Sequence, residues 1–148
     1  MSRARLVSVM VALAATLVLA TGVQATPGTA VTITSLTSTS GTGDPFSSTG
    51  GVVCASGTVS NAWARFIGWQ SNSAAQILID KHFECADGTF EILLRVTLDF
   101  NTCDTVATWS VLSGTDAYVN LRGAGSLTGD SDCGGTILDV YTGSMHYN

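Results

Sequence analysis

The sequence predicts an all-β fold, an antiparallel up-and-down β-barrel of about eight strands, with a β-sandwich as the alternative. Apolar and polar residues alternate along most of the chain after residue 51, and Gly, Asp or Ser separate the alternating runs. No amphipathic run is long enough to predict a helix. A closed barrel leaves long strands without exposed edges, which favours it over the sandwich.

The clearest strand is the run "TFEILLRVTLDF" at residues 89–100. Its even positions are apolar, from Phe90 to Phe100, and most of its odd positions are polar. Strict period-two alternation predicts a half-buried strand. Residues 74–85 alternate in the same way, with Ile77, Ile79 and Phe83 opposite Leu78, Asp80, His82 and Glu84. The turn sequence "ADG" between the two runs predicts a hairpin.

Five further runs bounded by turn residues predict strands at 52–61, 64–70, 105–112, 117–128 and 136–147. Residues 26–51 form a Ser/Thr/Gly-rich segment in which 13 of 26 residues are Ser or Thr. It contains one possible first strand at 29–36, and residues 37–51 are predicted to be a flexible loop or spacer. We therefore expect the barrel domain to span residues 52–148.

Residues 1–25 have the plan of a secretory signal peptide, with Arg3 and Arg5 before an apolar run and small residues before a cleavage point after Ala25. The alternative interpretation of the apolar run is a membrane anchor. Cleavage predicts a secreted, extracellular protein. Its remaining basic residues are Arg65, Lys81, Arg95 and Arg122, and its formal charge is 4 − 11 = −7. Scattered basic residues and a negative charge argue against nucleic acid and anionic membranes as partners.

Four cysteines lie in the exported part, which favours two disulfides over a zinc site because the sequence has no C-x-x-C and only two histidines. Strand direction predicts the pairing. Cys103 and Cys133 are separated by one strand up and one strand down, so they lie at the same end of the barrel. Cys85 and Cys103 lie at opposite ends of a strand that spans roughly 40 Å, far beyond the ~7 Å between bonded cysteine α-carbons. The predicted bonds are Cys54–Cys85 and Cys103–Cys133.

The segment "VLSGTDAYVNLRGAGSLTG" at residues 111–129 contains four glycines. Glycines inside a strand weaken it unless the backbone must bend or be approached closely, so we expect them to curve the sheet. Together with the last strand, "ILDVYTGSMHY", this segment resembles the closing part of the allene oxide cyclase and dirigent barrel superfamily. Asp116 stands where that family usually has a glycine. The resemblance implies an eight-stranded barrel with a central cavity, a homotrimer, and cofactor-independent cyclisation or coupling of small hydrophobic molecules.

Several residues are candidates for chemistry. The catalytic candidates are His82, Arg95, Arg122 and Asp139, and the ligand-binding candidates are Trp63, Trp69, Tyr118 and Tyr141. Each also has a structural explanation, because charged residues on a strand usually form the solvated outer face and aromatic residues usually pack in the core. No metal site or cofactor is predicted.

Two functions from different classes follow. The first is a secreted barrel that binds, and as an enzyme would cyclise or isomerise, a small hydrophobic molecule in its lumen. The alternative is a non-catalytic structural or surface-interaction barrel whose lumen is filled with side chains.

Overall fold

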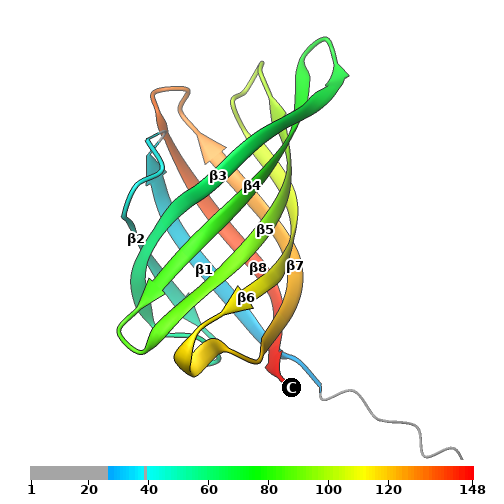
Figure 1. Cartoon of the computed structure of the whole chain (residues 1–148). Coiled ribbons are helices and arrows are strands. Elements are labelled where there is room, and N and C mark those ends of the chain that lie inside the picture. The colour runs from blue at the N-terminus through cyan, green and yellow to red at the C-terminus, as the bar shows by residue number, and fades with distance from the viewer. Residues whose placement is uncertain (1–26, 39) are drawn as a thin grey trace, which may run out of the picture.

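A computed structural model describes residues 27–38 and 40–148, and the predicted signal peptide lies outside these residues. The described chain forms a closed barrel of eight antiparallel strands in which each strand pairs with its neighbours in sequence and β8 pairs with β1 (Figure 1). The elements are β1 (Thr29–Ser38), β2 (Asp44–Thr49), β3 (Ser56–Ser71), β4 (Ala74–Cys85), β5 (Gly88–Asp99), β6 (Thr105–Gly114), the short 3-10 helix η1 (Asp116–Tyr118), β7 (Leu121–Ser131) and β8 (Thr136–Tyr147).

The predicted up-and-down barrel is confirmed, and the sandwich alternative is excluded by the ten-residue ladder between β1 and β8. This ladder closes the barrel by pairing Thr29 with Met145 and Ser38 with Thr136. Closure removes both edges of the sheet, which otherwise present unpaired backbone groups to other chains.

The N-terminal segment contributes more to the barrel than its composition predicts. Asp44–Thr49 form strand β2, so the prediction of a flexible loop over residues 37–51 is wrong for this part, and the barrel begins at β1 rather than at residue 52. Phe46 is the only large apolar residue of β2, and it is buried in the core. The short strand carries too few alternating apolar residues to stand out among Ser and Thr.

Two of the predicted strands are in fact one. Residues 56–71 form the single long strand β3, which has register shifts at Asn61/Trp63, Phe66/Gly68 and Trp69/Ser71. Each bulge inserts an extra residue and breaks the period-two alternation, so the sequence suggests two strands. A third difference concerns Tyr118, which belongs to η1 and not to the strand that follows it.

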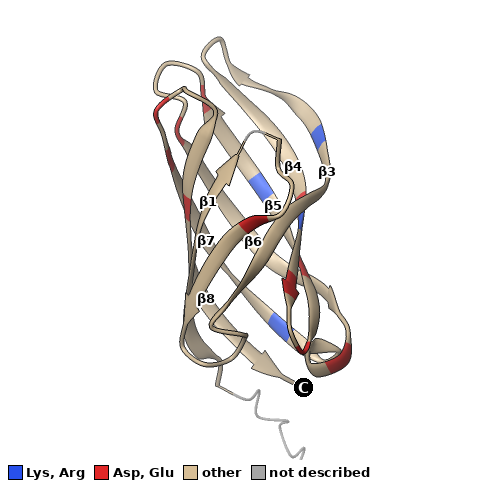
Figure 2. Cartoon of the chain, turned by 90° about the vertical axis from the view of Figure 1, so that its left-hand side faces the viewer, with Lys and Arg blue, Asp and Glu red and all other residues tan. Residues whose placement is uncertain are grey.

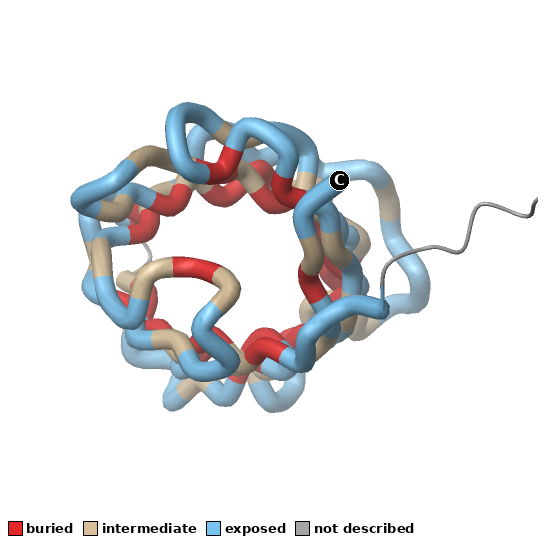
Figure 3. Tube along the Cα trace, turned by 90° about the horizontal axis from the view of Figure 1, so that it is seen from below, coloured by how far each residue is buried: buried red, intermediate tan, exposed pale blue. Residues whose placement is uncertain are grey.

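The two ends of the barrel differ. Figure 3 looks along the barrel from below and shows the buried positions on the inside of the ring. At this lower end, Val53 from the β2–β3 loop and Tyr118 from η1 join the hydrophobic core. The upper end holds the loops β1–β2, β3–β4, β5–β6 and β7–β8, and the β3–β4 hairpin projects beyond the others (Figure 1).

Both predicted disulfides are present, one at each end. Cys54–Cys85 joins the β2–β3 loop to the end of β4 in the lower half, and Cys103–Cys133 joins the loops β5–β6 and β7–β8 at the upper end. Each bond closes a loop of about thirty residues, with sequence separations of 31 and 30. The strand-direction argument therefore predicted the pairing correctly.

Candidate functional site: the upper half of the lumen

Aromatic rings fill the lower half of the lumen. Phe83 and Phe90 stack with ring centroids 4.8 Å apart, and Phe46 and Tyr141 meet Phe83 edge-on at 5.2 and 5.7 Å. Tyr118 covers this group from η1, with its ring 5.4 Å from Phe90. Phe46, Phe83, Phe90, Tyr141 and Tyr118 thus pack together as one aromatic plug in the lower half of the lumen.

The upper half of the lumen is hollow instead. It contains a cavity of about 210 Å³. The apolar wall is formed by Ile79, Leu94, Val96, Leu127 and Ile137. The polar lining residues are Thr37, Ser38, Asn61, Lys81, Thr105 and Asp139. The cavity therefore has a mixed lining, with polar side chains from the five strands β1, β3, β4, β6 and β8.

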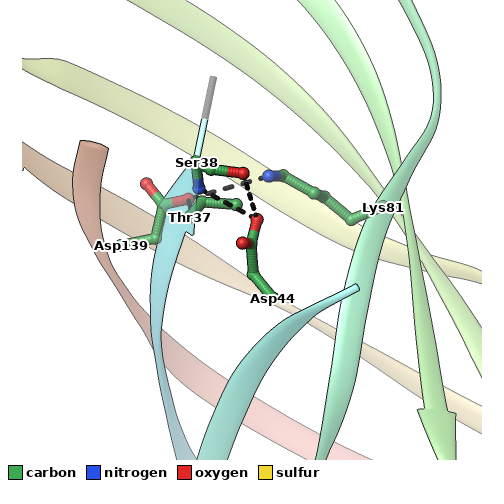
Figure 4. Close-up of polar contacts among 5 residues, drawn as sticks. All are labelled: Thr37, Ser38, Asp44, Lys81 and Asp139. Atoms are coloured by element: carbon green, nitrogen blue, oxygen red, sulfur yellow. Dashed lines mark hydrogen bonds and ion pairs between the residues drawn. The ribbon is translucent and has the colours of Figure 1, made fainter. Parts of the chain in front are cut away.

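Lys81 and Asp139 are the charged residues of this cavity. The Nζ atom of Lys81 lies 3.8 Å from Oδ2 of Asp139, and the two side chains are only 5% and 8% exposed. The Thr37 hydroxyl donates a hydrogen bond of 2.6 Å to the same carboxylate oxygen. Figure 4 shows Lys81 approaching from β4 while Asp139 and Thr37 approach from β8 and β1.

A second carboxylate lies beside this pair. Asp44 accepts hydrogen bonds from the backbone N–H of Ser38 at 2.9 Å and from its hydroxyl at 3.2 Å (Figure 4). Asp44 also acts electrostatically on Lys81 and stabilises its ammonium form. One ammonium thus faces two carboxylates, and the local field disfavours an anionic ligand.

Burial shifts both partners of the ion pair toward their neutral forms. Desolvation lowers the pKa of Lys81, and the carboxylates of Asp139 and Asp44 oppose this shift. Desolvation also raises the pKa of Asp139, and the Thr37 hydroxyl and Lys81 oppose that shift. Because its pKa is lowered, the Lys81 ammonium holds its proton less firmly than it would in water.

The length of β2 leaves the side of the cavity thinly covered. β2 pairs with β3 only over Ser56–Val59, so the upper part of β3 continues without β2 beside it. The β1–β2 loop covers this position, and the Asn61 N–H donates a hydrogen bond of 2.7 Å to the Gly41 carbonyl. A loop held in this way opens at lower free-energy cost than a paired strand, because fewer backbone hydrogen bonds must break.

A second hollow lies nearer the rim. It measures about 230 Å³ and is lined by Leu98, Phe100, Ile137 and the Cys103–Cys133 disulfide, among others. Ile137 also lines the first cavity. On the projecting hairpin, the ring of Trp69 lies 5.4 Å from Phe66 and 5.6 Å from Phe100. The entrance to the lumen is therefore aromatic and apolar.

Only one of the four catalytic candidates from the sequence points into the lumen. That residue is Asp139. His82 and Glu91 are cross-strand neighbours on the outer face, with His82 Nδ1 3.7 Å from Glu91 Oε1. Arg95 is exposed, and Arg122 is exposed with its guanidinium donating to the carbonyl of Leu121 at 2.7 Å. The structure thus separates Asp139 from the other three.

The four aromatic candidates also occupy different positions. Trp63 lies on the outer face opposite Asp80, and Trp69 stands at the rim with 68% of its surface exposed. Tyr118 belongs to the lower plug, where its hydroxyl donates to Asp87 at 2.7 Å and accepts from the Cys54 N–H at 3.1 Å. Burial and Asp87 raise the pKa of Tyr118 to about 12. Only Trp69 is placed to meet a ligand at the entrance.

Tyr141, the plug residue on β8, is fully buried one inward position along the strand from Asp139. Among the described residues, the hydroxyl of Tyr141 and that of Ser35 have no hydrogen-bond partner. Both side chains belong to the inward-facing set of their strands. They add two unsatisfied polar groups to the interior of the barrel.

Sequence reasoning did not single out Lys81. Its position in β4 has the same parity as Ile77, Ile79 and Phe83, which places it on the inward face. A lysine among inward-facing apolar residues of a strand is the signal that could have identified it. Thr37 was missed because it lies in the segment predicted to be a loop.

The glycines of β7 and β8 make room for a ring. Gly125 pairs with Gly143, and the indole of Trp109 lies over both. A Cβ atom would lie 2.7 Å from Trp109 Cε2 at Gly125 and 2.6 Å from Trp109 Cζ2 at Gly143. Close approach of the Trp109 ring is therefore a specific reason for these glycines, in addition to the expected curvature.

Comparison of the chain with protein-family models, with curated proteins and with solved structures gave no match. Within residues 27–38 and 40–148, no helix has the length and apolar character to span a membrane. The same residues contain no group of three or more His, Cys, Asp or Glu side chains arranged to hold a metal ion.

Proposed function

We propose that the protein is a secreted, disulfide-stabilised barrel that binds a small hydrophobic molecule in the upper half of its lumen. The observation that carries this proposal is the cavity above the aromatic plug, with its apolar wall and its buried Lys81–Asp139 pair. A purely structural barrel of this width would be filled by side chains. Here the lower half is filled and the upper half is open.

The size of the cavity supports a small ligand. A dry protein cavity of about 150 Å³ binds benzene, and this cavity measures about 210 Å³. The adjoining hollow of about 230 Å³ extends the apolar surface toward the rim. Together they suit an elongated molecule whose polar end lies near Lys81 and whose apolar end lies near Phe100.

The charges favour a neutral polar end. A hydroxyl or carbonyl oxygen can accept a hydrogen bond from the Lys81 ammonium, and a hydroxyl can donate to Asp139. A carboxylate would face both Asp139 and Asp44. We therefore propose neutral alcohols, aldehydes and ketones as the ligand class.

The same proposal includes membership of the allene oxide cyclase and dirigent-like barrels and a homotrimeric assembly. Asp116 supports the family assignment, because it has a φ of 49° at the position where that family usually has a glycine. Glycine adopts this left-handed conformation most readily, and Asp is among the residues that tolerate it. The mass of the native protein in solution tests the trimer.

The two disulfides support export, because such bonds persist in oxidising compartments outside the cytosol. Figure 2 shows that acidic residues outnumber basic ones on the described chain and that several lie near the loops at the barrel ends. This distribution supports a soluble extracellular protein without a nucleic-acid partner.

Native mass spectrometry of protein recovered from the culture medium is the first test, followed by extraction and identification of any bound molecule.

A matched pair of variants, titrated with octanol as the probe ligand, then locates the binding site. Val96 lines the cavity, whereas Val106 is 56% exposed on the outer face of the adjacent strand. We expect Val96→Phe to weaken octanol binding at least tenfold and Val106→Phe to leave it unchanged. Equal affinities of the two variants would place binding outside the lumen.

The alternative is a non-catalytic surface-interaction barrel, and the exposed rim cluster Phe66, Trp69 and Phe100 favours it. Exposed aromatic clusters often mark contact sites for other molecules. Replacing Trp69 with Ala discriminates between the two functions. If the rim serves as the entrance to the lumen, W69A slows octanol uptake. If the rim is a protein contact, W69A removes the partner and leaves octanol uptake unchanged.

A further inference from the structure

Lys81 is the single lysine in the sequence of 148 residues. The other basic side chains are arginines, and those in the described chain are exposed, whereas Lys81 is buried inside the barrel. Lysine is usually a surface residue and is almost never fully buried without a partner. A chain whose one lysine lies in its apolar cavity uses that amine for something other than solubility.

A primary amine differs from a guanidinium in the chemistry it offers. Arginine stays protonated in proteins, whereas a desolvated lysine releases its proton more easily and becomes a nucleophile. Burial lowers the pKa of Lys81, which increases the fraction of neutral amine. An arginine at this position would form the ion pair with Asp139 equally well but could not act as a nucleophile.

We propose that Lys81 captures an aldehyde or ketone ligand as a covalent imine, with Asp139 as the proton carrier. This inference rests on the proposed ligand site and specifies its chemistry. The geometry that supports it is the position of Lys81 on the cavity wall and the 3.8 Å separation between its Nζ atom and Oδ2 of Asp139.

The step balances without any additional reactant. Asp139 takes one proton from the Lys81 ammonium, and the freed lone pair attacks the carbonyl carbon. A C–N bond forms, the C=O π bond opens, and the oxygen takes up the proton to give a carbinolamine. Loss of this hydroxyl group as water, with a proton returned through Asp139 and the nitrogen proton released, leaves the C=N double bond. The reaction is a condensation with loss of water, so it needs no oxidant and no reductant.

Asp139 is suited to this role by its surroundings. Burial raises the pKa of the Asp139 carboxyl group, so it accepts a proton more readily than an exposed aspartate. The Thr37 hydroxyl donates to Oδ2 at 2.6 Å and holds the carboxylate in place. Asp44 acts on Lys81 from β2 and stabilises the protonated amine when no carbonyl ligand is bound.

The apolar wall also favours the imine once it forms. Imines hydrolyse in water, and a cavity lined by Ile79, Leu94, Val96 and Leu127 limits the access of water to the C=N carbon. The water released in the reaction leaves toward the upper end. Aldehydes should therefore bind more tightly than alcohols, because both fit the non-covalent site but only aldehydes also form a covalent bond.

The test uses the purified protein with both disulfides intact, octanal as the probe and cyanoborohydride as the trapping reductant. Intact mass and peptide mapping then report octyl groups on Lys81 and on the N-terminal amine, which is the internal reference. We expect Lys81 to be labelled at least tenfold faster than the N-terminal amine. Excess octanol, which occupies the cavity without forming an imine, should suppress labelling of Lys81 and leave that of the N-terminus unchanged.

The outcomes separate this inference from the proposed function. If octanol binds in a manner sensitive to Val96→Phe but octanal labels only the N-terminus, the lumen binds ligands and the imine is wrong. Labelling of Lys81 that octanol does not suppress indicates non-specific amine chemistry and also overturns the inference. If neither compound binds, both proposals fail. Lys81→Arg should lose the adduct, and the wild-type peptide map decides the question even if this variant does not fold.

Discussion

The Lys81 ammonium reaches across the barrel to the Asp139 carboxylate, 3.8 Å away, from a strand four positions distant in the closed sheet. β4 and β8 share no backbone hydrogen bonds, so this side-chain contact joins opposite walls of the lumen. The pair lies directly above the aromatic plug and marks the boundary between the packed and the open half. The stability of the barrel and the proposed ligand recognition therefore depend on the same two residues.

Replacing one partner of this pair should lower the unfolding free energy more than replacing both partners. Lys81→Met leaves Asp139 buried without its counter-ion, and we expect a loss of about 3–5 kcal/mol in unfolding free energy at pH 7. The double variant Lys81→Met with Asp139→Leu removes both charges and should recover most of that loss. Urea unfolding followed by tryptophan fluorescence measures both.

Arg95→Met serves as the matched control, because Arg95 is an exposed cation on the neighbouring strand. It should change the stability by less than about 0.5 kcal/mol. If the double variant lost as much stability as Lys81→Met alone, the unpaired Asp139 carboxylate would not be the cause of the loss, and the prediction would be wrong.

Asp80 provides a pH prediction on the other face of β4. It is 6% exposed, and among the described residues its Oδ1 atom has no hydrogen-bond partner. Burial raises its pKa above 3.8, the charge of Glu91 raises it further, and the side chains of Trp63 and His82 oppose the shift. The folded state therefore holds the Asp80 proton more tightly than the unfolded state.

The sign of the effect follows from proton linkage. Between the raised folded-state pKa and 3.8, the folded protein binds more protons than the unfolded protein, so the Asp80 contribution to stability increases as the pH falls. Asp80→Asn removes the charge with little change of shape. We expect it to stabilise the protein at pH 7 and to have progressively less benefit toward pH 4, measured as urea midpoints. A benefit that is constant with pH would contradict the raised pKa.

Gly125 should be intolerant of a side chain. In Gly125→Ala, the new Cβ atom meets Trp109 Cε2 at 2.7 Å and also the backbone of β8. Overpacking of this kind typically costs about 1–3 kcal/mol. Gly68→Ala in β3 is the control, since a Cβ atom there meets no atom within 4 Å. Thermal unfolding of the two variants tests whether the indole requires the glycine, and equal midpoints would show that it does not.

The sequence predicted the barrel well because period-two alternation survives in β4, β5, β6 and β8. It failed where that signal is interrupted. In β3, bulges near Asn61 and Phe66 shift the parity, and in β2 a single buried residue, Phe46, carries the whole apolar face. The total of eight strands was reached because one strand was divided and another was missed.

The site was harder to predict than the fold. Parity groups Lys81 with the inward residues of β4, and Asp139 was a candidate on its own strand. Their contact depends on the closure of the sheet, which the ladder between β1 and β8 fixes over a separation of about a hundred residues. Period-two patterns contain no information on which strands face each other across a lumen.

The two disulfides should differ in how much they contribute to the unfolding free energy. By loop entropy alone, each bond with a sequence separation of 31 or 30 contributes about 3–4 kcal/mol. Cys54 and Cys85 also pack against the core, and the Cys54 N–H donates to the hydroxyl of Tyr118 in the lower plug. Cys103 and Cys133 line the hollow at the rim of the lumen. We therefore expect C54S/C85S to lose more stability than C103S/C133S.

Octanol affinity should show the opposite order. C103S/C133S frees the β5–β6 and β7–β8 loops and alters the rim, so it should weaken binding severalfold at a temperature where the variant is still folded. C54S/C85S changes only the plugged end and should bind octanol as the wild type does. Titrations on both variants, with circular dichroism to confirm folding, measure this. Loss of affinity in C54S/C85S alone would move the ligand site from the upper to the lower half of the lumen.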